Sequence, residues 1–217
     1  DTWKSRGLGD VYKRQTQDDA IQDLLEPIDD QIAWITGSQV CYCAEAFQGV
    51  SRQHPDAAAL SVLATVLRNG FLHTAIREKG GAYGAGAIND TATNTFKFFS
   101  YRDPKCTETF SAFREAIEWS KTSITDQHLE EAILGVVSSI DKPLSPVGEA
   151  KNDFNFNLEN ISTKERLEMR QRVINCSIND LIRVCEKYLT KPSKKSILAG
   201  KAYSEEASSL GLNLREI

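Results

Sequence analysis

The sequence lacks the long hydrophobic run that a membrane-spanning helix requires. Its apolar runs are short, as at 57–60 and 62–63, whereas a membrane span needs about 18 residues. A secretory signal is not recognisable either, because the first residues are polar and no apolar core follows the early basic residues. We therefore expect no membrane partner.

An excess of positive charge is also lacking. The chain has 26 basic and 30 acidic residues and a formal net charge of −4, which argues against nucleic acid or an anionic membrane as the main partner. Hydrophobic residues make up 41% and charged residues 26%, values that are typical of soluble globular proteins and exclude disordered and collagen-like chains. The length of 217 residues suits one large domain or two small ones.

Histidines are too few and too scattered for a metal site. Of the three, only His128 lies in a suggestive pattern, but Ala132 stands where the inverted zinc-peptidase motif H-x-x-E-H has its second histidine. A catalytic zinc usually needs three protein ligands. We expect no metal site in this chain, and we place His128 at the surface in the first turns of a helix that Thr125 caps.

The five cysteines form no pattern typical of a metal site or of a disulfide framework. Their number is odd and their spacing is scattered, and a single C-x-C without a second pair is a weak metal signal. On a strand, Cys41 and Cys43 point to the same side. We expect all five to be reduced thiols, mostly small core residues, which favours a reducing compartment and so the cytoplasm. The cysteines are Cys41, Cys43, Cys106, Cys176 and Cys185.

The first fifteen residues resemble a translated sequencing adaptor. The chain begins with Asp1, and codons GAT GTG TAT AAG AGA CAG for residues 10–15 match the transposon end used in such adaptors. We therefore exclude 1–15 from the fold as a disordered artefact, treat 16–32 as the remnant of a preceding segment, and place one domain at 33–217. The alternative is a genuine basic tail. An adaptor at this point implies that the gene continues upstream.

Hydrophobic periodicity predicts few strands and many helices. Residues 39–47 alternate as a strand. The glycine turn at 80–86 leads into a further strand, and 94–101 suit the antiparallel partner of that further strand. A helix opens at His54–Asp56, Gly70 interrupts it, and a second helical piece follows at 71–79. The pattern predicts an α+β fold with two layers, in which helices pack on a mostly antiparallel sheet. The further expected elements are helices at 105–122, 126–140, 147–158, 163–174 and 178–190, a short strand at 196–200 and an edge element at 210–217.

The stretch from Leu67 to Ala87 is the most informative part of the chain. Four glycines within seven positions permit positive φ angles and the close approach of another chain. The spacing excludes the phosphate-binding patterns G-x-G-x-x-G and G-K-S/T. A substrate-facing turn could present Arg77, whose guanidinium offers several fixed donors, and Tyr83, whose hydroxyl can donate to an oxyanion. The alternative is a glycine-rich bend with a packed tyrosine.

Four ordered motifs together resemble one protein family. They are IREKGGAYGAGA (76–87), FFSYRDP (98–104), AILGVVSSIDKPLSP (132–146) and RQRVINCSINDLIRV (170–184). In this order they are similar to the C-terminal domain of the presequence-protease branch of the pitrilysin/insulinase-like (M16) zinc metallopeptidases, with its LuxS/MPP-like fold. The resemblance covers about residues 33–214. Within these motifs, 101–104 and 141–143 are read as a strand end and a helix terminator.

The resemblance implies a peptidase of which this chain is one part. Family members enclose unfolded peptides between two halves, and the N-terminal half holds zinc through H-x-x-E-H and a distant glutamate. That motif is missing here, so the resemblance implies zinc in the full-length enzyme only, with this fragment inactive alone. By motif, Arg77 and Tyr83 match family residues that contact the peptide backbone. Arg77 is expected to anchor substrate carbonyls, and Tyr83 to donate to the carbonyl oxygen as it gains charge.

Two other functions remain open on the sequence. The chain could belong to a non-catalytic M16-like binding or scaffold subunit, although Arg77 and Tyr83 weigh against this. It could also be a stand-alone peptide-binding module, which requires residues 1–15 to be genuine.

Overall fold

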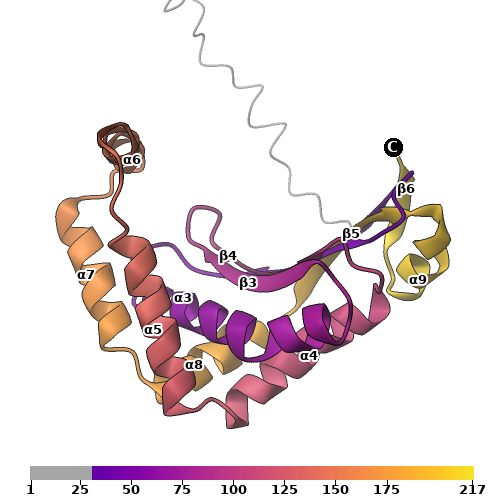
Figure 1. Cartoon of the computed structure of the whole chain (residues 1–217), viewed down its shortest axis with the longest axis horizontal. Coiled ribbons are helices and arrows are strands. Elements are labelled where there is room, and N and C mark those ends of the chain that lie inside the picture. The colour runs from indigo at the N-terminus through magenta and orange to yellow at the C-terminus, as the bar shows by residue number, and fades with distance from the viewer. Residues whose placement is uncertain (1–30) are drawn as a thin grey trace, which may run out of the picture. The chain divides into compact units, whose positions relative to one another are not determined.

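The computed structural model describes residues 31–217, in which helices cover one face of a six-stranded mixed sheet (Figure 1). The expected adaptor at 1–15 and nearly all of 16–32 lie outside the described residues, and the boundaries proposed for them stay predictions. Residues 31–217 form one unit by contact. The expected α+β class with helices on a mostly antiparallel sheet is confirmed.

The sheet has the strand order β3-β4-β2-β5-β1-β6. The pairings of β3 with β4, β4 with β2 and β2 with β5 are antiparallel, whereas β1 pairs parallel with both β5 and β6. The two ends of the sheet are therefore the edge strands β3 and β6. The strands are β1 Ile32–Thr36, β2 Tyr42–Gln48, β3 Gly84–Asp90, β4 Thr95–Tyr101, β5 Ser193–Gly200 and β6 Asn213–Glu216.

The alternation predicted at 39–47 is confirmed by burial. Cys41, Cys43, Glu45 and Phe47 point to one side and are buried almost completely. The residues between them are more exposed and belong to the other face of the sheet. One face of the sheet is therefore the core face, and helices pack against it.

The longest helix runs from Ala57 to Glu78 without a break. Its first part, α3 (Ala57–Leu67), is α-helical, and its second part, η1 (Arg68–Glu78), is π-helical. The predicted interruption at Gly70 is wrong. A Cβ at this position would lie 2.6 Å from the Trp119 ring, so the glycine lets two helices approach closely. The helix is long and apolar enough to cross a membrane, but nine residues of α3 are buried in the protein core.

Four of the remaining helices begin where the sequence places good caps, whereas the helices that begin at Thr107 and Ser204 have no side-chain cap. Thr125, Ser162 and Ser177 each accept a hydrogen bond from the third helical residue, whose side chain bonds back to the cap. The predicted helices at 126–140 and 163–174 are confirmed to the residue. The helices are α4 Thr107–Thr122, α5 Asp126–Ile140, α6 Pro146–Leu158, α7 Thr163–Ile174, α8 Ile178–Val184 with the π-helical turn η2 Cys185–Leu189, and α9 Ser204–Ser209 after the 3-10 turn η3 Lys201–Tyr203.

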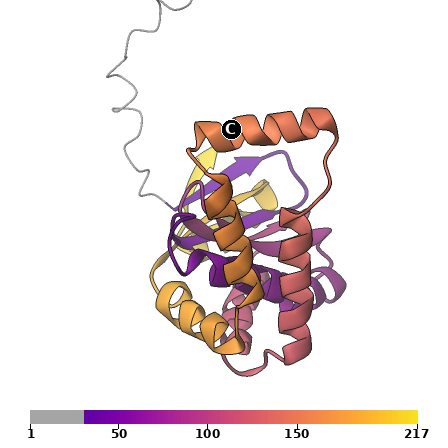
Figure 2. The ribbon, with the colours of Figure 1, turned by 90° about the vertical axis from the view of Figure 1, so that its left-hand side faces the viewer.

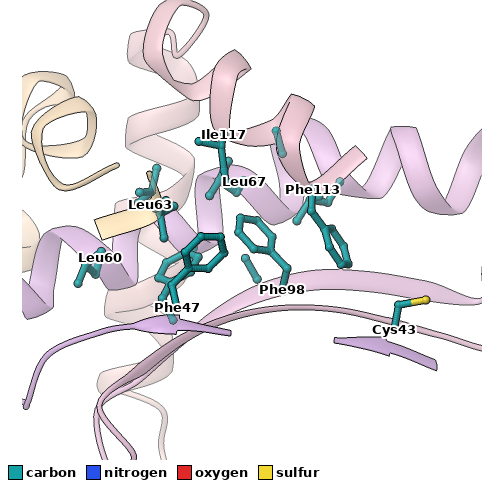
Figure 3. Close-up of a cluster of buried hydrophobic side chains, with 14 of the residues drawn as sticks. Cys43, Phe47, Leu60, Leu63, Leu67, Phe98, Phe113 and Ile117 are labelled. Atoms are coloured by element: carbon teal, nitrogen blue, oxygen red, sulfur yellow. The ribbon is translucent and has the colours of Figure 1, made fainter. Parts of the chain in front are cut away.

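Aromatic and aliphatic side chains fill the space between the sheet and its helices (Figure 3). Phe98 of β4 stacks on Phe113 of α4, with ring centroids 5.2 Å apart, and meets Phe47 of β2 edge-on at 6.0 Å. Leu63 and Leu67 of α3 close the cluster, fully buried. Each such side chain contributes roughly 1.5–3 kcal/mol by leaving water. Figure 2 shows α5 and α7 side by side.

The expectation of five reduced thiols is wrong for two of them. Cys41, just before β2, forms a disulfide with Cys106, just before α4. The Cα atoms are 6.4 Å apart, within the ordinary range for a disulfide. The partners are 65 residues apart in sequence, so spacing gave no sign of the pair. Cys43, Cys176 and Cys185 are free.

Candidate functional site

The turn between η1 and β3 is built on two glycines. The Gly81 N–H donates to the Arg77 carbonyl oxygen over 3.1 Å, and Gly81 has φ +86°, which favours glycine. A Cβ on Gly80 would collide with the carbonyl oxygen of Ile76. The Ala82 N–H donates to the Ile76 carbonyl oxygen over 3.1 Å. These bonds end the helix and send the chain directly into the edge strand.

Arg77 lies in the last turn of η1, and its side chain is exposed. Within residues 31–217 its guanidinium has no ion pair or hydrogen bond. A cation at the C-terminal end of a helix is favoured by the helix dipole. Its five donors are therefore free to bind an acceptor from outside this part of the chain.

Tyr83 stands at the other end of the same turn and is 61% exposed. Its backbone N–H donates to the Arg102 carbonyl oxygen over 3.2 Å. Its ring meets Tyr101 edge-on, with centroids 5.6 Å apart, and the Arg102 guanidinium carbon lies 5.7 Å from the Tyr83 ring centroid. The backbone and the ring of Tyr83 are thus held, while its hydroxyl has no partner in the described part of the chain.

The strand end that supports Tyr83 is itself anchored in the core. Arg102 has φ +49°, an uncommon conformation for a residue with a side chain. The next residue, Asp103, is fully buried, and its carboxylate accepts from the Thr109 hydroxyl over 2.6 Å and from the Lys105 N–H over 3.0 Å. Asp103 also exchanges two backbone hydrogen bonds with Cys41.

Residues 101–104 were expected to be a strand end, and β4 indeed ends at Tyr101. The contact of this strand end with Tyr83 was not predicted from the sequence. One signal was present: the antiparallel pairing of 94–101 with the strand after the glycine turn brings Tyr101 opposite Gly84. A Cβ on Gly84 would collide with the Tyr101 ring, so this glycine makes room for the tyrosine.

His128 occupies a helix start as expected, and the residue is partly exposed. The ring packs edge-on against Trp119, with centroids 5.3 Å apart, and its Nδ1 accepts from the Thr125 N–H over 3.2 Å. Residues 31–217 contain no group of three His, Cys, Asp or Glu side chains that could hold a metal ion. The described donor set therefore does not fit a zinc site.

The arrangement suits recognition of a peptide backbone. A free guanidinium and a free phenol stand six residues apart on one rigid turn, next to the edge strand β3. Both groups are donors that prefer carbonyl or carboxylate oxygens. In residues 31–217, no base forms a hydrogen bond or an ion pair with either group, so the turn has the donors that bind and polarise a carbonyl but no paired base that would activate a nucleophile.

Comparison with known proteins identifies relatives over most of the chain. The model of the PreP C-terminal domain matches residues 37–198. Mitochondrial presequence proteases of Eremothecium gossypii and Xenopus tropicalis are 41% and 40% identical over 71% and 70% of this chain. That of Saccharomyces cerevisiae is 34% identical over 82%. The chain spans only 16%, 14% and 18% of these relatives' lengths, respectively.

Solved structures share the fold at low sequence identity. A protease from Helicobacter pylori has a TM-score of 0.67 at 20% identity, over 80% of this chain and 45% of that one. Pitrilysin has a TM-score of 0.61 at 14% identity, over 86% and 22%. The inactive domain of a peptidase M16 from Pseudomonas fluorescens has a TM-score of 0.61 at 16% identity, over 79% and 44%.

The names of the curated relatives place those proteins in mitochondria, so they give no support to the cytoplasmic location expected from the cysteines. The family resemblance expected from the four motifs is confirmed by the match over residues 37–198. The chain belongs to the PreP C-terminal domain family.

Proposed function

We propose that this chain is the C-terminal, substrate-contacting part of a zinc metalloendopeptidase that degrades unstructured peptides in an enclosed chamber. The observation that carries the proposal is the turn at 77–83. It holds the backbone of Arg77 and Tyr83 rigidly, and it leaves the guanidinium and the phenol unpaired within residues 31–217. The names of the relatives, presequence proteases, make presequence peptides one candidate substrate class.

Each of the two side chains has a separate role in this proposal. Arg77 binds carbonyl oxygens of the peptide backbone near the scissile bond and so fixes the register of the peptide. Tyr83 donates a hydrogen bond to the scissile carbonyl oxygen, which accepts more strongly as it gains negative charge. Stabilisation that grows toward the transition state raises turnover, whereas equal binding of ground and transition states does not.

Zinc and its ligands belong to residues outside this chain, in an N-terminal half of the same polypeptide. The zinc supplies the Lewis acid and the activated water of the reaction. The fragment alone is then inactive, because the described residues hold neither the metal nor a base. The mitochondrial relatives favour an organelle matrix as the compartment.

A non-catalytic binding or scaffold subunit is the second proposal. The likeness to an M16 inactive domain is a likeness of fold, which is compatible with this alternative and with the first proposal alike. On this alternative, Arg77 and Tyr83 hold a peptide that is not cleaved. The two proposals differ in what lies upstream of residue 16, and not in the fold of residues 31–217.

The test is to determine the upstream sequence with adaptor-free long reads and to assay the complete protein. The peptidase proposal predicts an open frame that encodes H-x-x-E-H, one zinc per complete chain, and hydrolysis of an unstructured peptide. The 217-residue chain should bind no stoichiometric zinc. A frame without the zinc motif would contradict the peptidase proposal and favour the scaffold.

A further inference from the structure

A pocket of about 420 Å³ lies beside the edge strand β3, on the side where the helices pack. Strand β3 contributes Ile88 and Asn89, α5 contributes Gly135 and Val136, and α3 contributes Ala64. This pocket is distinct from the turn at 77–83, although the same edge strand leads from one to the other. The catalytic role proposed above makes no use of it.

The pocket is positively charged. The described residues that line it include two ionisable side chains, Arg52 and Arg68, and no acidic one. The Arg52 Nε is buried without a hydrogen-bond partner, and its guanidinium carbon lies 5.5 Å from the centroid of the Phe156 ring. No carboxylate within residues 31–217 forms an ion pair with Arg52. Arg52 is a half-buried residue, and its unpaired, buried Nε favours an anionic ligand.

Asn89 adds a second unused polar atom. Its Nδ2 donates to the Ala57 carbonyl oxygen and to the Ser61 hydroxyl, each over 3.1 Å, which ties the edge strand to α3. Its Oδ1 is buried without a partner. The pocket therefore holds one buried donor and one buried acceptor that the described residues leave unsatisfied, and a polar ligand would pair with both.

The outer edge of β3 has no strand paired with it in residues 31–217; along this edge Ile88 is exposed, and Gly84 and Gly86 are buried. Within the described sheet, β3 has β4 as its one neighbour. The Tyr83 N–H donates to the Arg102 carbonyl oxygen, so the backbone of Tyr83 faces β4. Along an antiparallel ladder, residues whose backbone groups face the partner strand alternate with residues whose backbone groups face away. Hence the N–H and C=O groups of Gly84, Gly86 and Ile88 point away from β4. An unpaired edge of this kind is a template for an extended peptide.

The outer edge of β3 runs from the turn at 77–83 to the pocket. From Tyr83 to Ile88 the strand advances five residues, about 16 Å at 3.3 Å per residue. A peptide paired along this edge would contact the turn at 77–83 at one end and reach the pocket at the other. Because side chains of a strand alternate between faces, such a peptide would direct a side chain toward the helices and into the pocket.

We propose that the free edge of β3 binds an extended peptide segment as an additional strand, and that the pocket lined by Arg52 and Arg68 binds an acidic side chain of that segment. The inference rests on the proposed function in taking the ligand to be a peptide. It goes beyond that function because it assigns a charge preference to a position some five residues away from Tyr83.

The test uses the isotope-labelled 217-residue chain and two capped octapeptides of alternating Thr and Val, one with a single central Glu and the other with Gln in its place. The Glu peptide should bind about tenfold more tightly, as expected for a charge-assisted hydrogen bond. On binding, the amides of Gly84, Gly86 and Ile88 should become protected from hydrogen exchange. Arg52→Gln and Arg68→Gln should each abolish the preference for Glu.

Arg68 is exposed, so Arg68→Gln should stay folded even where Arg52→Gln does not. The matched control is Lys164→Gln, which removes an exposed cation on α7 and should leave the preference intact. Equal affinity for the two peptides, protection that omits the β3 edge, or no binding at 1 mM would each overturn the inference. If the complete protein still hydrolyses peptides, the proposed function survives that result.

Discussion

Replacing Asp56 by Asn tests how the helices are held behind the sheet. Asp56 is 4% exposed and precedes α3 as its N-cap residue. Its Oδ1 accepts from the Arg183 guanidinium over 2.7 Å, and its Oδ2 accepts from the Lys187 amine over 2.8 Å and from the Tyr188 hydroxyl over 2.7 Å. This single carboxylate therefore ties α8 and η2 to the start of α3.

The expected loss of stability follows from the three hydrogen bonds that the Asp56 carboxylate accepts. A hydrogen bond to a charged group contributes roughly 1.5–3 kcal/mol when it is shielded from water. Arg183 and Lys187 are half exposed, so their contributions are discounted heavily. We expect Asp56→Asn to lower the free energy of unfolding by about 3 kcal/mol at pH 7, which corresponds to a fall in Tm of about 6–12 °C for a domain of this size.

The pKa of the Asp56 carboxyl determines how the loss of stability in Asp56→Asn changes with pH. Burial by itself would raise the pKa of the Asp56 carboxyl, but the hydrogen bonds from Lys187, Tyr188 and Arg183 hold that pKa well below its ordinary value. The stabilisation is then complete above the unfolded pKa of about 3.9 and declines as the pH falls toward the folded pKa. At pH 3 the difference between wild type and variant should shrink to about 2 kcal/mol.

The assay is urea denaturation followed by tryptophan fluorescence, at pH 7 and at pH 3. The control is Asp153→Asn, which removes an exposed carboxylate on α6 and should leave the midpoint unchanged. An Asp56→Asn variant as stable as wild type at pH 7 would refute the reasoning. So would a loss that grows as the pH falls.

Three further changes address the disulfide and the turn. Reducing the bond between Cys41 and Cys106, which are 65 residues apart, should lower the free energy of unfolding by about 4 kcal/mol; equal urea midpoints with and without reductant would contradict this. Gly84→Ala should displace the Tyr101 ring and cost about 1–3 kcal/mol of stability; unchanged stability and unchanged turnover would show that the ring has room. Arg77→Ala should raise KM for peptides in the complete protein without changing the Tm, because the Arg77 side chain has no partner in residues 31–217; a lowered Tm would show a structural role.

The sequence was most informative where local chemistry decides the structure. The caps Thr125 and Ser162 fix the starts of α5 and α7, and the alternation around Cys43 and Glu45 identifies a strand. In these segments each local preference agrees with the fold, so periodicity and capping suffice.

Features that depend on distant partners were missed. Strand β1 was not predicted, because its role comes from parallel pairing with β5 and β6 far along the chain. The bond between Cys41 and Cys106 joins segments that meet only in the folded protein. Gly70 was read as a helix breaker, although it is a contact point for a helix that follows it in sequence. In each case tertiary packing overrides the local preference.

The sequence singled out the two residues of the candidate site, whose role stays a prediction, but it did not predict the contacts that hold them. The glycine pattern and the family motifs singled out Arg77 and Tyr83, and both prove to be exposed and unpaired in the described chain. The contacts of Tyr101 and Arg102 with Tyr83 depend on strand register. No single-sequence pattern encodes that register reliably.

The most direct test of the central claim is the turnover of an unstructured peptide by the complete protein carrying Tyr83→Phe. The change removes one hydroxyl that has no partner in residues 31–217, so folding should be unaffected. The matched control is Tyr42→Phe, which removes another hydroxyl without a hydrogen bond in the same part of the chain. The account predicts that kcat falls about 10²–10³-fold for Tyr83→Phe and stays near wild type for Tyr42→Phe. Unchanged kcat with Tyr83→Phe would contradict the account.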